Sequence, residues 1–71
     1  MTIEFDNQLY SGAAVKQAIL DYGDIAQITC IPTDHSIQCT IVKSAYDMVL
    51  TKMEFCNYVL SLSVSMDGSQ L

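Results

Sequence analysis

The chain has 71 residues, of which 51% are hydrophobic and 15% are charged, and its formal net charge is −5. Three lysines and no arginine are too few cations to neutralise the phosphates of a nucleic acid or of an anionic membrane surface. No apolar run reaches the roughly 18 residues that a membrane-spanning helix needs. We therefore expect one domain, with neither a nucleic acid nor a membrane as its partner.

The composition also predicts association with another protein. A chain of this length buries only about 60% of its unfolded surface, so small domains usually gain stability from a metal, a disulfide or a partner. The charged fraction of 15% lies below the roughly 25% of a typical domain, and an apolar surface patch is therefore expected. We predict a homodimer or a complex with a partner protein.

The first predicted element is a strand over Thr2 to Asp6. Polar and apolar side chains alternate there, with Ile3 and Phe5 on the apolar face, which is typical of a half-buried strand. The same residues contain neither the basic region nor the apolar core of a signal peptide. Three cysteines are also an odd number for a disulfide framework. The sequence therefore predicts a cytoplasmic protein with reduced thiols.

A helix is predicted over residues 12–22. Ser11 is a favourable N-cap residue. Apolar residues recur at helical spacing at Ala14, Val15, Ala18, Ile19 and Tyr22. Gly23 is expected to end the helix in a left-handed conformation. Asp21 and Asp24 lie at its carboxyl end, where the helix dipole disfavours negative charge. They either mark a site for a basic group or are two solvated acids at a turn.

Two β-branched segments, residues 25–31 and 37–42, enclose a polar turn and predict a β-hairpin. A loop of either two or four residues gives the same register. This register places Cys30 opposite Cys39 and Ile28 opposite Ile41. All four side chains are expected on one face of the sheet.

A second helix is predicted after Asp47, which is a suitable N-cap residue. Its apolar residues form two stripes. One stripe is Val49, Met53, Cys56 and Leu60, and the other is Met48, Phe55, Val59 and Leu62. A small sheet can cover only one side of such a helix. We therefore predict that the second stripe, Met48, Phe55, Val59 and Leu62, contacts another chain.

Residues 60–66 alternate strictly between apolar residues and serine, which is typical of a strand. A fourth strand here would complete a ferredoxin-like β-α-β-β-α-β unit. No turn separates this run from the helix before it, however, so we favour a helix that continues to about Ser63. The predicted fold is a two-layer α+β domain, β-α-β-β-α, over residues 1–66, with a three-stranded sheet and two helices on one face. Residues 67–71 are predicted to be a flexible tail.

Few residues could carry chemistry. Four are of the types that bind zinc: Cys30, Cys39, Cys56 and His35. Eight and sixteen residues separate the cysteines, which is unlike a zinc-binding spacing, and we expect the thiols to pack in the core. A Cys30–Cys39 disulfide has acceptable geometry but would stay open in a reducing cytoplasm. Glu4 and Asp6 share a strand face through alternation alone. We predict no enzymatic activity, no catalytic residue, no metal and no cofactor.

Two groups of residues resemble a known family. One is Phe5-Asp6, Leu9-Tyr10-Ser11, a helix through Val15 and Ala18, and Tyr22 before a Gly-Asp turn; the other is Glu54-Phe55-Cys56-Asn57-Tyr58-Val59-Leu60. Over nearly the whole chain, their order is similar to that of the HxsD-like small proteins of His-Xaa-Ser peptide-maturation systems. The resemblance implies an accessory factor that accompanies a radical-SAM enzyme. The chain departs from the family pattern after Leu60, where Ser61-Leu62-Ser63-Val64 replaces an expected acid and a later Leu-Arg pair.

These patterns favour a binding protein over an enzyme. An exposed edge strand can accept a peptide through main-chain hydrogen bonds, or can pair with a second copy of itself. We expect a non-enzymatic accessory or adaptor module that binds a peptide or a partner enzyme. The alternative is a structural homo-oligomer with no ligand of its own.

Overall fold

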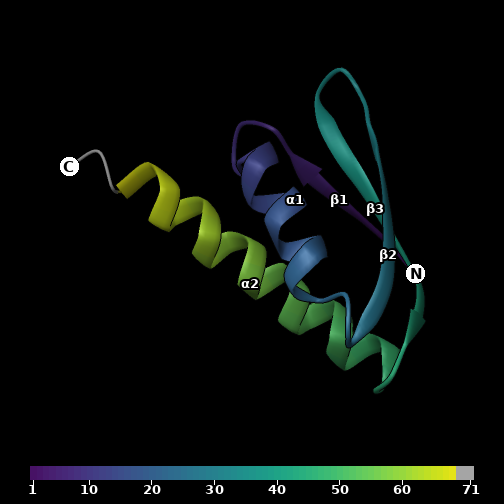
Figure 1. Cartoon of the computed structure of the whole chain (residues 1–71). Coiled ribbons are helices and arrows are strands. Elements are labelled where there is room, and N and C mark those ends of the chain that lie inside the picture. Colours follow the sequence, from purple (N-terminus) through teal and green to yellow (C-terminus); the bar gives the residue numbers. More distant parts are fainter. Residues whose placement is uncertain (69–71) are drawn as a thin grey trace.

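The computed structural model describes residues 1–68, with side chains for residues 1–65. In chain order the elements are β1 (Thr2–Asp6), α1 (Gly12–Asp21), β2 (Ala26–Pro32), β3 (Ser36–Ser44) and α2 (Met48–Gly68). The three strands form one antiparallel sheet in the order β1-β3-β2, and both helices lie on the same side of it (Figure 1). This α+β arrangement confirms the predicted fold class.

The sheet has the topology of a split β-α-β unit. Strands β1 and β2 both pair antiparallel to β3, so they run parallel to each other and α1 is the crossover between them. Strand β3 is therefore central, and each outer strand pairs on one side only within the described residues. The outer edges of β1 and β2 are open to pairing.

The hairpin register follows the prediction. Cys30 lies opposite Cys39 and Ile28 lies opposite Ile41, and a register shift between Gln27 and Ile28 marks an irregularity at the start of β2. The alternation of apolar side chains fixes this register because a slip of one residue would turn every core side chain to solvent.

Helix α1 begins as predicted but ends differently. The Ser11 hydroxyl accepts a hydrogen bond from the Ala14 amide at 3.4 Å, as expected of an N-cap. Gly23, however, does not adopt the predicted left-handed conformation, since no described glycine has a positive φ. The helix instead ends at Tyr22, which has φ −90° and donates its amide hydrogen to Ala18.

Helix α2 is longer than the sequence indicates. It is capped by Asp47, whose carboxylate accepts from the Leu50 amide at 3.0 Å, and it continues to Gly68. The alternative fourth strand over residues 60–66 is therefore wrong. The Ser63 side chain is 2% exposed and accepts a hydrogen bond from the Ser11 amide at 3.0 Å, which ties this part of α2 to the start of α1.

The boundary predicted after residue 66 also moves. Residues 67 and 68 belong to α2, so the tail predicted at 67–71 does not begin at residue 67. Residues 69–71 lie outside the described part of the chain.

The core lies between the sheet and the two helices. Phe55 of α2 packs edge-to-face against Phe5 of β1, at 5.9 Å between ring centroids, and against Tyr22 of α1, at 5.2 Å. Small residues Ala14 and Ala18 of α1 are fully buried, so the backbone of this helix can approach its neighbours closely. The aromatic ring of Phe55 thus contacts both the sheet and the other helix, which is the arrangement that positions α2.

Candidate functional site

The structure corrects the predicted interface on α2. Phe55 and Val59 are both 0% exposed and belong to the core, and Met48 and Leu62 are half-buried against it. Phe55 and Val59 therefore have no exposed surface for another chain, whereas Met48 and Leu62 pack against the core and keep part of their surface exposed. Both stripes are apolar, so the sequence alone does not show which one is buried. In the structure the stripe that contains Phe55 is buried, because Phe5 and Tyr22 pack their rings against Phe55.

The other apolar stripe of α2 is exposed to solvent. Its members Val49, Met53, Leu60 and Val64 are between 45% and 62% exposed, and we call them the α2 outer stripe. Cys56 lies beside them and is half-buried against the core. Their spacing places them on one side of the helix, opposite Tyr58, whose hydroxyl donates to Asp21 of α1 at 2.5 Å. The outer stripe therefore faces away from α1.

A pocket lies beside the first turns of α2, between the end of α1 and the connection from β3 to α2. It has a volume of about 260 Å³ and we call it the tyrosine pocket. Its lining residues are Tyr22, Ile25, Tyr46, Leu50, Thr51 and Glu54. One wall comes from α1, one from the connection before β2, and the rest from the β3–α2 connection and the first turns of α2.

The walls of the tyrosine pocket are held in place by packing and hydrogen bonds. The Tyr22 ring contacts Phe55 and also lies 5.5 Å from the Tyr58 ring, between centroids. At the base, the hydroxyl of Thr51, a residue that is 4% exposed, bonds the Ser44 hydroxyl at 2.7 Å. The pocket is therefore largely formed in the absence of a ligand.

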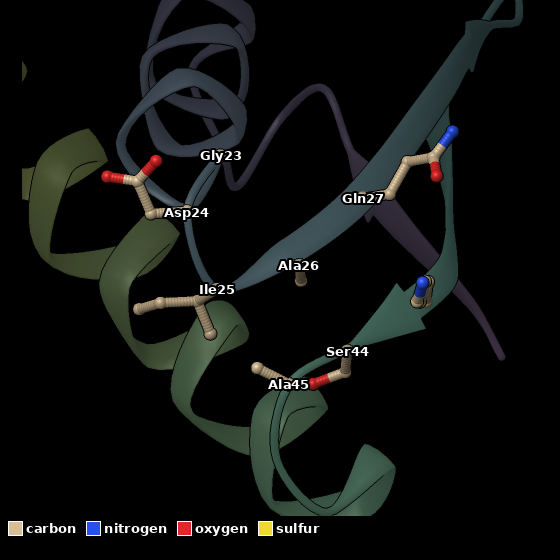
Figure 2. Close-up of a pocket in the computed structure, with 8 residues that line it drawn as sticks. Gly23, Asp24, Ile25, Ala26, Gln27, Ser44 and Ala45 are labelled. Carbon is tan, nitrogen blue, oxygen red and sulfur yellow. The ribbon is translucent and has the colours of Figure 1, made fainter.

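One carboxylate, Glu54, lines this pocket, and a second, Asp21, is next to Tyr22 in the sequence. Burial raises the pKa of the Tyr22 phenol, and the nearby Glu54 carboxylate raises it further. Hydrogen bonds from Tyr58 and then from Gln17 hold the pKa of Asp21 below its usual value, so this carboxylate stays ionised near neutral pH. Figure 2 shows a neighbouring hollow formed by residues 23–27 and 43–45, in which Ile25 points toward α2 and Asp24 projects on the same side.

The three cysteines carry free thiols that differ in their burial. Cys39 is fully buried, and burial raises the pKa of its thiol to about 11. Burial also raises the pKa of Cys56. Cys30 is exposed, contrary to the predicted core position, because it lies near the end of an edge strand and lines a groove beside α1. Within the described part of the chain, no three Cys, His, Asp or Glu residues are grouped to hold a metal ion.

The carboxylates of the first strand have structural partners. Glu4 accepts a hydrogen bond from the Ser36 hydroxyl at 3.0 Å, and Asp6 accepts one from the Gln8 amide at 2.8 Å. His35 lies at the tip of the hairpin, where its carbonyl accepts from the Asn7 amide at 2.9 Å. The Glu4 and His35 bonds fasten the hairpin to β1 and to the turn after it, whereas the Asp6 bond lies within that turn. The structure does not bring His35 together with Cys56 or the tyrosine pocket.

Sequence reasoning identifies only part of this site. It marks the acids at the end of α1 as a site for a basic group or as solvated residues, whereas it places Tyr46 in a connection and gives it no role. A tyrosine at the end of a helix with an acid on either side, Asp21 and Asp24, is the available signal. It cannot reveal Tyr46 and Glu54, because the turn between β3 and α2 brings them to Tyr22 only in the folded chain.

Comparisons of the chain with protein-family models, with curated proteins and with solved structures found no match. Neither described helix combines the length and the apolarity needed to cross a membrane.

Proposed function

We propose that this protein is a non-enzymatic accessory module that binds a partner protein through the α2 outer stripe. The observation that carries the proposal is the position of Val49, Met53, Leu60 and Val64. They form one exposed apolar row on a helix whose opposite side is already buried in the core. Large apolar side chains gathered on one face are typical of association sites, whereas scattered ones are ordinary.

The arrangement of the polar residues supports binding rather than catalysis. The single histidine lies at the hairpin tip, and the Cys39 thiol, with its pKa of about 11, remains protonated near neutral pH. The Glu4 carboxylate accepts from Ser36 of the hairpin, and the Asp6 carboxylate accepts from Gln8 in the turn after β1. The resemblance to HxsD-like proteins suggests the class of partner, which is an enzyme that modifies a ribosomally made peptide.

The proposal can be tested by titration with defined partners. The labelled chain would be titrated with the purified products of neighbouring genes, and the titration would be repeated with Leu60→Lys and with Ser61→Lys. Both variants add the same charge to an exposed position of α2, but only Leu60 belongs to the outer stripe. We expect Leu60→Lys to weaken binding by at least about tenfold, since it places a charge in an apolar contact. Equal effects of the two variants, or no binding at micromolar concentration, would count against the proposal.

A second copy of the chain is the alternative occupant of the same stripe. Val49, Met53, Cys56 and Leu60 follow one another at spacings of four, three and four residues, which is the spacing of two helices packed in a coiled-coil seam. None of these residues is charged, so two copies would not repel each other along the contact. Light scattering that shows only single chains at high concentration would rule this alternative out.

A further inference from the structure

We propose that the tyrosine pocket binds a cationic side chain, a lysine ammonium or an arginine guanidinium, presented by the partner protein. The inference rests on the proposed function only in taking the cation to be part of a protein. The pocket's own preference for a cation is a separate property, which small probes can measure.

Two aromatic rings and one carboxylate line the pocket. Tyr22 forms a fixed wall, and Tyr46 is 67% exposed with its ring available to a ligand. A cation that lies over a tyrosine ring is attracted by the negative face of the ring. Glu54 adds a full negative charge at the same place, and it forms no hydrogen bond or ion pair with another described residue.

The carboxyl end of α1 also favours a cation at this pocket. Tyr22 is the C-cap of this helix, and the last turn contains no basic residue. The carboxyl end of a helix carries a partial negative charge that favours a nearby cation. Asp21 and Asp24 add to this charge instead of neutralising it, and Asp21 is held ionised by Tyr58 and Gln17. Acids at this position cost the free chain stability, and a bound cation would relieve that cost.

The chain's own lysines lie elsewhere. Lys16 lines the groove beside Cys30, Lys43 lines the hollow on the other side of the α1–β2 connection, and Lys52 lies close to Cys56. None of the residues that line the tyrosine pocket is basic. The cation that would complete the charge balance must therefore come from outside the described part of this chain.

The size of the pocket suits one side chain. Sites for drug-sized ligands have volumes of about 300–1,000 Å³, and this pocket has about 260 Å³. The methylene groups of a lysine or arginine can lie against Ile25 and Leu50 while the charged end meets Glu54.

The test is an NMR titration of the 71-residue chain with three blocked pentapeptides that differ only at the central residue. That residue is lysine, arginine or norleucine, and the other four are glycine. We expect the lysine and arginine peptides to shift the amide signals of Tyr22, Ile25, Tyr46 and Leu50 saturably. The uncharged norleucine peptide should bind at least about fivefold more weakly, and salt at about 0.3 M should weaken the cationic peptides. Equal binding of lysine and norleucine peptides would overturn the inference.

Matched variants distinguish binding at the tyrosine pocket from a general attraction of cations to the negatively charged protein. Glu54→Gln and Asp34→Asn each remove one exposed carboxylate, but Asp34 lies at the hairpin tip, outside the tyrosine pocket. Glu54→Gln should weaken the lysine peptide by about three- to tenfold, and Tyr46→Ala should do the same, whereas Asp34→Asn should leave it unchanged. Equal loss in Glu54→Gln and Asp34→Asn would show only attraction to net charge and would refute the site.

The stripe variant Leu60→Lys distinguishes this inference from the proposed function. It lies outside the tyrosine pocket and should leave the peptide titration unchanged. If partner binding is lost in Leu60→Lys while no peptide binds, the inference fails and the proposed function stands. If peptides bind while Leu60→Lys and Ser61→Lys affect a partner equally, the proposed function fails and the pocket remains.

Discussion

At the scale of single residues, Phe55 is the side chain that decides the orientation of α2. Its ring is fully buried between Phe5 and Tyr22, so the helix cannot rotate without removing it from both contacts. Met53, two positions before it, is 59% exposed on the outer stripe. These near neighbours in the sequence therefore have different roles, and their substitution should affect the stability of the fold to very different extents.

We expect Phe55→Ala to destabilise the fold by about 3–5 kcal/mol, because it removes a buried ring and leaves a cavity. That loss is comparable with the whole stability of a chain this short. Met53→Ala should change the free energy of unfolding by less than about 0.5 kcal/mol. Urea denaturation of both variants, followed by circular dichroism, checks this. A similar loss in both would mean that the outer stripe is buried too.

The buried Cys39 thiol should make the fold sensitive to alkali. Its pKa is raised from 9.0 to about 11 in the folded protein, mainly by burial. Between these values the unfolded chain releases the thiol proton and the folded chain keeps it, so stability falls as pH rises from about 9 to 11. The urea midpoint of the natural chain should fall more steeply across this window than that of Cys39→Ala. Cys30→Ala, which removes an exposed thiol, should retain the steep fall.

At the scale of the elements, a hydrogen bond joins the start of α1 to the C-terminal part of α2. The Ser63 hydroxyl lies on the buried side of α2 and accepts from the Ser11 amide, at the first turn of α1. A serine at this position satisfies a helix terminus that would otherwise need another acceptor. Ser63 is also one of the serines that alternate with apolar residues over residues 60–66, the pattern that is typical of a strand.

We expect Ser63→Ala to destabilise the protein by about 1 kcal/mol, the usual net value of one hydrogen bond. Ser61→Ala is the matched control, because Ser61 is exposed on the same helix and alanine is the better helix former. It should be neutral or slightly stabilising. Thermal unfolding of the two variants side by side measures the difference, and equal midpoints would contradict the role given to Ser63.

Much of the fold is predictable because local patterns agree with one another. Alternation and turn residues are sufficient to determine the hairpin register that pairs Cys30 with Cys39. The face of α2 is not predictable, because apolar residues occur nearly all round it and the choice depends on partners that are distant in the sequence, Phe5 and Tyr22. The tyrosine pocket escapes prediction for the same reason, since its walls come from three separate segments.

At the scale of the whole molecule, negative charge is in excess. The net charge is −5, and none of the three lysines forms an ion pair with another residue of the described chain. Glu54 lines the tyrosine pocket and Asp24 lines the neighbouring hollow, while Asp6 and Asp34 line a pocket beside the hairpin tip. Repulsion between them is not offset inside the chain and is strongest at low ionic strength.

We therefore expect the melting temperature to rise with sodium chloride between about 0.02 M and 0.5 M. A stabilisation of about 1 kcal/mol would raise it by about 4–8 °C in a domain of this size. Scanning calorimetry measures the change. Asp34→Asn, which removes one negative charge at an exposed turn, should show a smaller rise. A melting temperature that falls with salt would mean that attractive charge pairs dominate instead.

The central position of β3 has a consequence for the order in which the chain assembles. Cys39 pairs with Cys30 nine residues away and with Ile3 thirty-six residues away. The fourfold longer loop costs about 1.2 kcal/mol more in closure entropy, so the hairpin forms more readily than the β1–β3 pair. In the sequence β1 comes before both strands of the hairpin, and its partner β3 is the last of the three. Of the three strands of this sheet, β1 is thus expected to be the last to pair.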